Sequence, residues 1–154
     1  QTAPLGSRAP IQDAAASWLS DCLSKIDHGR LLLFDYCSAS TAEIAITPWR
    51  EWLRTYREQG RGTHYLTEPG SQDITTQVML DQIPTGFTTS AQADFLTQWG
   101  VDELVREGAD YWESLKHAPD VAAMKMRSRP TEAISLTSSL ALGLFETLIW
   151  TVSI

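Results

Sequence analysis

An unbroken apolar run, Leu31–Phe34, followed at once by Asp35 and Tyr36, constrains the fold of this chain more than any other segment. Such a run is typical of a parallel strand that is covered on both faces. The preceding residues, 13–26, carry apolar side chains every three or four positions, which predicts a helix with Asp13 as its cap. Helix, loop and buried strand form half of an α/β unit. Ligands of open parallel sheets collect beyond the carboxyl ends of the strands, so we expect Asp35 and Tyr36 beside a binding crevice.

The rest of the chain predicts further helices and strands without internal repeats or flexible linkers. Residues 47–57 fit either a helix or an extended segment, and both readings stay open. A strand is expected around Val78, and a helix beginning at Thr89 or Ser90 and stopped by Gly100. Further helices are expected over 102–118 and over 120–129, the latter closed by Pro130, before a final strand over 144–152. We therefore expect one α/β domain spanning residues 1–154.

Charge and composition exclude several classes of protein. The chain has 12 Lys and Arg against 19 Asp and Glu, a net charge of −7, which disfavours nucleic acids and anionic membranes as partners. Its apolar runs are far shorter than the ~20 residues of a membrane-spanning helix. The two cysteines, Cys22 and Cys37, lack zinc-ligand spacing and are expected to be reduced thiols in a cytoplasmic protein. The opening at Gln1 leads us to expect a piece of a longer protein.

The common catalytic and cofactor motifs are not found in this sequence. Neither a dinucleotide-binding nor a phosphate-binding glycine loop occurs, and no serine lies in a nucleophile elbow. The three histidines, His28, His64 and His117, are too widely spaced to indicate a metal site. We therefore expect no metal.

Three features remain as candidates for binding. Four arginines at helical spacing could form a cationic stripe, although a solvated face paired with nearby glutamates is the favoured reading; they are Arg50, Arg54, Arg57 and Arg61. The pairs Trp49 with Trp52 and Trp99 with Trp112 could be stacking platforms, but such aromatics more often belong to a core. The turn at Pro69–Gly70 delivers Gln72, Asp73 and Thr75 together toward one sheet end, where turn capping by Asp73 is as plausible as a site role.

Seven stretches, taken in order, resemble the carboxyl-terminal half of the MidA family of S-adenosylmethionine-dependent methyltransferases in its actinobacterial form. They are LGSRAPIQDAAASWL, GRLLLFDYCSAS, PWREWLRTY, PGSQDITTQVMLDQ, TTSAQADFLTQWGVDELV, MRSRPTEAISL and LGLFETLIWTV. The most specific is PGSQDIT followed by QADFL, residues 92–96. The resemblance spans nearly the whole chain.

The resemblance implies a fold, a cofactor and a reaction. It implies the last strands of a class I, Rossmann-like methyltransferase sheet: the fifth over 31–36, the sixth around Val78, and an antiparallel seventh over 144–152, with a helical cap at about 89–130. It also implies S-adenosylmethionine as cofactor and methylation of arginine side chains of partner proteins. The family's acidic-Gly-x-Gly segment and its other cofactor residues do not occur in residues 1–154. The isolated chain is therefore expected to be inactive alone and to supply none of the cofactor-binding residues.

Family residues carry over only onto matched positions, and their catalytic roles stay unassigned. The substrate-side candidates are Asp35, Tyr36, Arg54, Tyr56, Gln72, Asp73 and Thr75. Carboxylates can hold and polarise a guanidinium, so Asp35 and Asp73 are the candidates for that task, although both could be structural. The alternative function is a non-catalytic protein-interaction module that docks a partner through residues 91–129. An unpaired sheet edge would also favour a homodimer.

Overall fold

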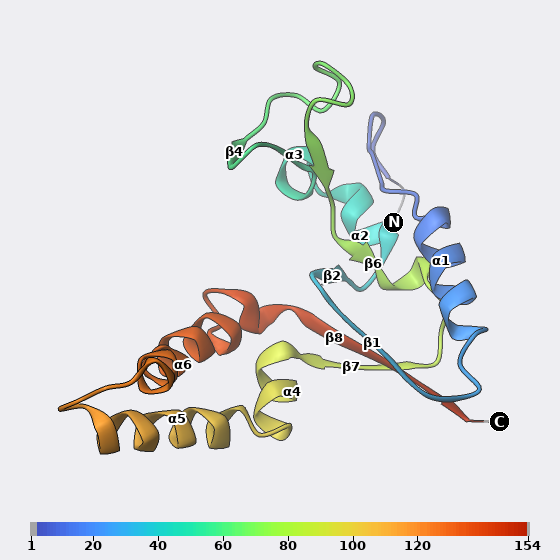
Figure 1. Cartoon of the computed structure of the whole chain (residues 1–154). Helices are drawn as coiled ribbons and strands as arrows, with labels where there is room; N and C mark the ends of the chain where they lie inside the picture. The colour runs from blue at the N-terminus through green and yellow to red at the C-terminus, as the bar shows by residue number, and fades with distance from the viewer. Residues whose placement is uncertain (1–2, 154) are drawn as a thin grey trace. The chain divides into compact units, whose positions relative to one another are not determined.

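The computed structural model describes residues 3–153 and divides them into two compact units (Figure 1). The first unit comprises residues 3–31, 35–87 and 151–153, and the second comprises residues 32–34 and 88–150. The expectation of one domain stays a prediction. No helix among the described residues is long and apolar enough to span a membrane.

Short helices and strands make up most of the first unit. They are α1 (Asp13–Leu23), β1 (His28–Asp35), β2 (Cys37–Ser38), α2 (Thr41–Ile46), α3 (Trp49–Trp52), β3 (Arg54–Arg57), β4 (Gly60–Arg61), β5 (Asp73–Thr75), β6 (Val78–Met79) and the 3₁₀ turn η1 (Leu80–Gln82). The apolar core of this unit consists of Ile44, Trp52 and Met79, with Trp49 and Leu53 packed against them. The two cysteines are free.

Helix α1 lies within the predicted segment but is shorter and differently capped. It ends at Leu23 rather than Ile26, and its N-cap is Gln12, so the prediction that Asp13 caps it is wrong. The side chain of Gln12 binds other parts of the chain instead. Its Nε2 donates to the carbonyl oxygen of Gln77 at 2.8 Å, and its Oε1 accepts from the backbone N–H of Met79 at 2.8 Å.

A second glutamine completes this polar connection. The Oε1 of Gln82 accepts from the backbone N–H of Gln12 at 2.8 Å, and its Nε2 donates to the carbonyl oxygen of Pro10 at 2.9 Å. These partners are about 70 residues apart in sequence, so the two side chains hold the segment before α1 against β6 and η1. We call Gln12 and Gln82 the glutamine clamp.

Residues 47–57, for which both readings were open, form a helix and then a strand. Helix α3 spans only Trp49–Trp52, and β3 begins at Arg54. The four arginines expected at helical spacing therefore do not share a helix, and the cationic stripe does not form. Strand β3 pairs antiparallel with both β4 and β5, in the order β4-β3-β5.

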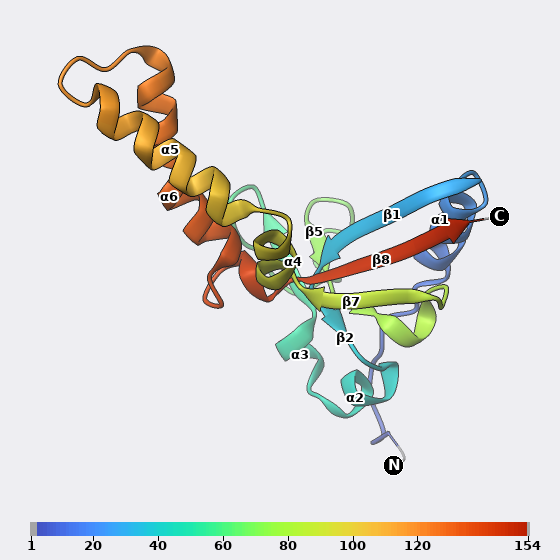
Figure 2. The same cartoon turned by 90° about the horizontal axis from the view of Figure 1, so that it is seen from below.

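A three-stranded sheet has the order β1-β8-β7, where β7 is Phe87–Ala91 and β8 is Glu146–Ser153. Figure 2 shows β8 pointing opposite to both neighbours, as expected for the final strand. The third strand of this sheet is β7, which pairs with β8 on the side away from β1. The Val78 region is not part of this sheet, so its assignment as the sixth strand is wrong. Val78–Met79 instead forms β6, which pairs in parallel with β2.

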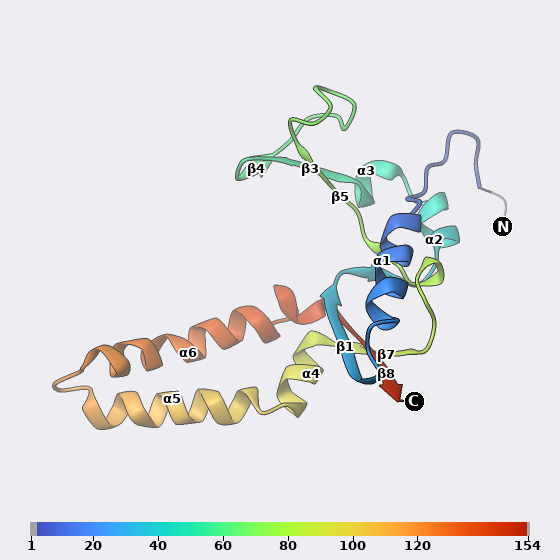
Figure 3. The same cartoon turned by 45° about the vertical axis from the view of Figure 1, so that its right-hand side comes forward.

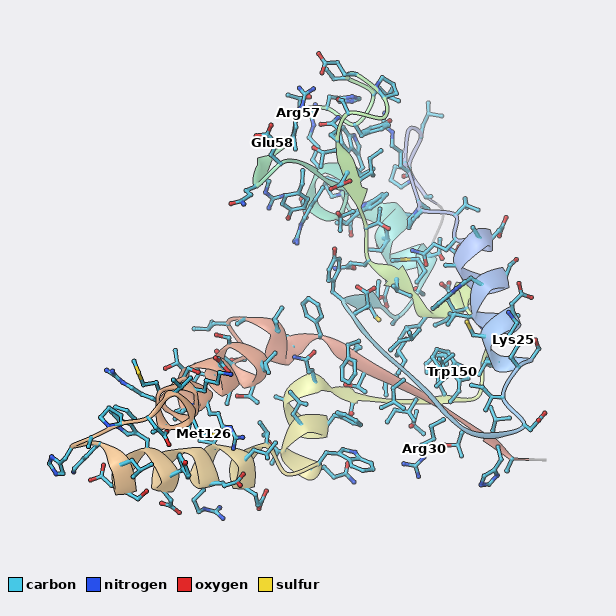
Figure 4. The ribbon with its side chains drawn as sticks, viewed as in Figure 1. Lys25, Arg30, Arg57, Glu58, Met126 and Trp150 are labelled. Atoms are coloured by element: carbon cyan, nitrogen blue, oxygen red, sulfur yellow. The ribbon has the colours of Figure 1, made fainter. Side chains whose placement is uncertain are left out.

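The central strand β8 is covered, whereas β1 is covered on one face in this chain. In β8, Leu148 and Trp150 are 1% and 3% exposed, and Figure 4 labels Trp150 on this strand. Along β1 exposure alternates, with Leu32 38% and Phe34 42% exposed, so cover on both faces is not found among the described residues. The apolar run in the sequence reflects the propensity of these residues to form a strand. Burial of each face of that strand depends on which other elements pack against it.

Three helices follow β7 in the second unit: α4 (Gln92–Gln98), α5 (Val101–Leu115) and α6 (Val121–Thr137). Thr89 and Ser90 lie in β7 and do not cap α4, so that prediction is wrong. Gly100 separates α4 from α5 with a φ of +91°, which agrees with its predicted role as a helix stop. Figure 3 shows α5 and α6 lying side by side as a helical hairpin.

Helix α6 begins where predicted but continues through Pro130. Its N-cap Asp120 accepts from the backbone N–H of Ala123 at 2.7 Å, whereas Pro130 lies inside the helix, so the predicted end there is wrong. Proline deprives the carbonyl four residues earlier, that of Met126, of its helical donor. A Cβ placed on Gly108 of α5 would lie 3.2 Å from that same carbonyl oxygen, so the glycine lets α5 approach α6 at this point; Figure 4 labels Met126 on α6.

Candidate functional site

Four of the seven candidate residues meet on one face of the β4-β3-β5 sheet. In the β3–β5 ladder Arg54 lies opposite Thr75, and Tyr56 lies opposite Asp73. Directly opposed residues, and residues two apart on a strand, share a face. The sheet therefore brings these four side chains together. We call this set the β3–β5 face.

A fifth side chain, that of Arg61, joins this face from β4. Arg61 lies opposite Tyr56 in the ladder, and its guanidinium carbon is 5.1 Å from the centre of the Tyr56 ring. Tyr56 thus lies between a cation on one side and the Asp73 carboxylate position on the other. Sequence reasoning placed Arg61 in a helical stripe and missed this contact, because the Gly60–Arg61 strand is too short to show any alternation.

Gln72, the candidate beside Asp73, fixes the loop that precedes β5. Its Oε1 accepts from the backbone N–H of Thr63 at 3.1 Å, and its Nε2 donates to the carbonyl oxygens of His64 and Thr67 at 2.9 and 3.1 Å. All of its hydrogen-bonding groups are used within the loop. Gln72 therefore acts on the β3–β5 face by positioning the chain that leads into Asp73.

Asp35 and Tyr36 lie elsewhere in the first unit, at the end of β1. The Oδ1 of Asp35 accepts from the backbone N–H of Tyr36 at 2.8 Å, and the carbonyl oxygen of Tyr36 accepts from Val78 at 3.0 Å. Burial raises the pKa of Asp35 above its ordinary value, and the hydrogen bond from Tyr36 opposes this in part. Asp35 ends a strand of a different sheet from the β3–β5 face, and Tyr36 follows directly after that strand.

The two candidate carboxylates differ in how free they are to bind a ligand. Asp35 is half-buried and already accepts a backbone hydrogen bond. Asp73 is exposed, and within residues 3–153 its carboxylate has neither a hydrogen bond nor an ion pair. Of the two, Asp73 is the carboxylate that can accept hydrogen bonds from a cationic side chain without breaking an internal contact.

A pocket of about 250 Å³ lies beside the opposite face of β3, where Thr55 is buried. Its walls include the rings of Trp49, His64 and Tyr65, together with Leu53 and Arg50. The Thr55 hydroxyl donates to the carbonyl oxygen of Thr63 at 2.6 Å, which closes one side. Because residues alternate along a strand, this pocket is separate from the face that carries Tyr56 and Asp73.

Neither of the two described pockets has a lining that fits S-adenosylmethionine. Its ribose hydroxyls need a carboxylate partner, and its methionine end needs close approach of a glycine-rich backbone. No carboxylate lines the pocket beside Thr55, and the second described pocket, between α5 and α6, has Glu132 among mostly apolar residues without a glycine turn. No group of three or more metal-ligand side chains occurs within residues 3–153. We therefore assign no cofactor-binding step to this chain.

Comparison with known proteins gives a family and a fold. The family model described as "Putative S-adenosyl-L-methionine-dependent methyltransferase" matches residues 1–97. A search of curated proteins gives no match. Two solved structures from Burkholderia thailandensis have a similar fold. One, an uncharacterised protein, is 19% identical with a TM-score of 0.70, over 96% of this chain and 41% of its own.

The second solved structure is a candidate methyltransferase bound to S-adenosyl-homocysteine. It is 21% identical with a TM-score of 0.64, over 90% of this chain and 36% of its own. The chain thus spans about two fifths of the length of these structures. At these identities the likeness shows the α/β fold, in agreement with the class predicted from the sequence.

Proposed function

Because this chain belongs to the family of S-adenosyl-L-methionine-dependent methyltransferases whose model covers residues 1–97, we propose that it forms the substrate side of an enzyme that methylates arginine side chains of a protein. The observation that carries the proposal is the β3–β5 face, where an unpaired carboxylate, Asp73, lies opposite an aromatic ring, Tyr56. Residues outside 1–154 hold the cofactor in this proposal.

The chemistry of methyl transfer determines what these side chains do. A cofactor held by residues outside this chain would supply an electrophilic methyl group. The guanidinium nitrogen would form the new C–N bond as the C–S bond breaks, and the proton that this nitrogen loses would pass to a carboxylate or to water. The protein must hold the guanidinium in line with the C–S bond, and a carboxylate does so with charge-assisted hydrogen bonds. Asp73 supplies the carboxylate, Tyr56 a surface for the planar group, and Gln72 holds the loop in place.

Substitution of Asp73 by asparagine tests this proposal in the full-length protein that contains the chain. Transfer of labelled methyl groups to protein arginine is expected to fall by about tenfold or more, because the amide cannot form a charge-assisted pair. The melting temperature should change by less than about 2 °C, since Asp73 has no internal partner to lose. The matched control is Asp110→Asn, an exposed aspartate on α5. Equal loss in both variants, or none in Asp73→Asn, would remove Asp73 from the site.

A second candidate function, docking of a protein partner, is supported by exposed apolar side chains on α6. Val121, Met124 and Ile134 are 72%, 60% and 64% exposed, so this helix presents apolar area that a partner could cover. We propose that this helix contacts the protein substrate or a second copy of the chain. Light scattering of wild type and of Met124→Gln with Ile134→Gln tests self-association. A monodisperse wild-type monomer would exclude the second copy.

A further inference from the structure

The aromatic pocket beside Thr55 has two cations of this chain at its rings, Arg50 and Arg8. The guanidinium carbon of Arg50, the neighbour of Trp49 in sequence, lies 5.1 Å from the ring centre of Trp49. The guanidinium carbon of Arg8 lies 4.6 Å from the ring centre of Trp49 and 5.3 Å from that of Tyr65. Both distances are within the range of favourable cation–π contact. Arg8 lies in the irregular segment before α1, more than 40 residues from either ring in sequence. Its position on these rings is therefore a tertiary contact that local structure does not impose.

The rings of Trp49, His64 and Tyr65 also contact one another. His64 and Tyr65 are stacked with centres 4.5 Å apart, and Trp49 meets them edge-on at 5.2 and 5.3 Å. Trp49 also packs against the core of the first unit. The three rings thus form a continuous aromatic wall, which we call the Trp49 cage. Such a preformed wall binds a flat cation with little ordering cost.

Arg8, by contrast, is held loosely. It is exposed, and within residues 3–153 no carboxylate pairs with it, so stacking is the contact that keeps it in place. The glutamine clamp fixes the chain at Pro10 and Gln12, two to four residues further along. Arg8 can therefore leave the cage by rotation of the segment before the clamp, without disturbing α1 or β6.

We propose that the Trp49 cage is a binding site for an arginine side chain of a protein partner, and that Arg8 occupies it in the absence of that partner. The cage has no carboxylate among its lining residues and lies on the opposite side of β3 from Asp73. It binds the flat faces of a guanidinium and leaves the edges free, so it serves for docking and not for methyl transfer. This proposal does not depend on the methyltransferase activity.

The expected effect of removing Arg8 on the affinity for a ligand follows from competition between Arg8 and the arginine of the partner. A ligand binds only to the fraction of molecules whose cage is open, so removing Arg8 raises the apparent affinity by the inverse of that fraction. In Arg8→Gln we expect the peptide acetyl-Gly-Arg-Gly-amide to bind about fivefold more tightly than in wild type. The matched control is Arg127→Gln, which removes another ring-stacked arginine, one that lies outside both the cage and the β3–β5 face, and should leave the affinity unchanged.

Calorimetry and the indole N–H signals in NMR measure this binding without any cofactor. The additional substitution His64→Ala in the Arg8→Gln background should abolish the gain, and a preserved melting temperature shows that the fold is intact. The peptide acetyl-Gly-Lys-Gly-amide should bind more weakly, since a compact ammonium stacks poorly.

Three results would overturn the proposal. One is equal affinity of the arginine peptide for wild type and Arg8→Gln. Another is equal binding of the lysine and arginine peptides, which would indicate attraction to the net negative charge alone. The third is binding of acetyl-Gly-Glu-Gly-amide by wild type that is lost in Arg8→Gln, because Arg8 would then be a ligand-binding residue for an acidic partner.

Discussion

The two compact units are stabilised in different ways. In the first unit, polar side chains such as Gln12, Gln82 and Gln72 reach across the sequence and bind backbone groups. In the second unit, backbone segments approach each other closely at glycines such as Gly108 and Gly143. In the first unit, glutamine side-chain amides hold the loops in place. The neighbouring Asp73 carboxylate and aromatic rings therefore remain free to bind a ligand. At Gly108 and Gly143, by contrast, the close approach of backbone segments requires that a side chain be absent.

The largest expected effect concerns the glycine contacts of the second unit. In Gly143→Ala the new methyl group would collide with the backbone carbonyl of Thr137, which cannot move independently of α6. We expect a loss of about 3 kcal/mol in the free energy of unfolding, measured with urea. The control is Gly86→Ala in the first unit, where φ is +90° and nothing lies within 4 Å, so that about 1 kcal/mol of backbone strain remains. Equal losses of stability in Gly143→Ala and Gly86→Ala would mean that close packing at glycine does not distinguish the second unit from the first.

The next effect tests the polar connections of the first unit. Gln12→Ala removes two hydrogen bonds and leaves the backbone groups of Gln77 and Met79 without these partners. We expect a loss of about 2 kcal/mol. Gln92→Ala in the second unit, which removes one bond to the carbonyl oxygen of Leu136, should cost about 1 kcal/mol. The exposed Gln98→Ala serves as control. If Gln92→Ala proved the more damaging, the contrast between the units would be wrong.

Loss of a helix cap is expected to destabilise either unit by a smaller amount. Asp120 caps α6 through a 2.7 Å bond, and Ser40 caps α2 through a 3.3 Å bond from Glu43. Asp120→Ala is expected to cost about 1 kcal/mol, and Ser40→Ala about 0.5 kcal/mol. Asp120→Asn should retain most of the stability, since its amide oxygen can accept the same bond. Thermal unfolding monitored by circular dichroism would show a loss in Asp120→Asn if charge mattered more than the hydrogen bond.

The smallest effect is a change in how stability depends on pH. Burial raises the folded-state pKa of Asp35 above its unfolded value, so its contribution to stability is fully present below the unfolded pKa and is lost as pH rises through the folded pKa. Asp35→Asn does not titrate. The variant should therefore gain stability relative to wild type as pH rises from the ordinary pKa of an aspartate through the raised folded-state pKa of Asp35. Urea unfolding across this range measures it, and a constant difference between the proteins would contradict it.

The sequence alone determined the elements whose signals are local. Asp120 and Gly100 mark helix ends through capping chemistry, and the apolar residues of 144–152 correspond closely to β8. The family resemblance also placed Arg54, Tyr56, Asp73 and Thr75 among the candidates, and the β3–β5 ladder brings them together. The helix ends and the final strand were accessible because each depends on residues within one short stretch, whereas the pairing of β3 with β5 joins two stretches.

Only the tertiary structure decided which stretches meet. Helix α6 continues through Pro130, and Gly108 lets α5 approach the carbonyl that the proline leaves without a donor. The neighbour of β8 is β7 rather than the Val78 strand, and Arg8 lies on Trp49 across more than 40 residues. Propensity and spacing report the conformational energy of a segment, whereas pairing, close approach and stacking depend on the free energy of contacts between segments. The sequence of either segment alone does not reveal that free energy.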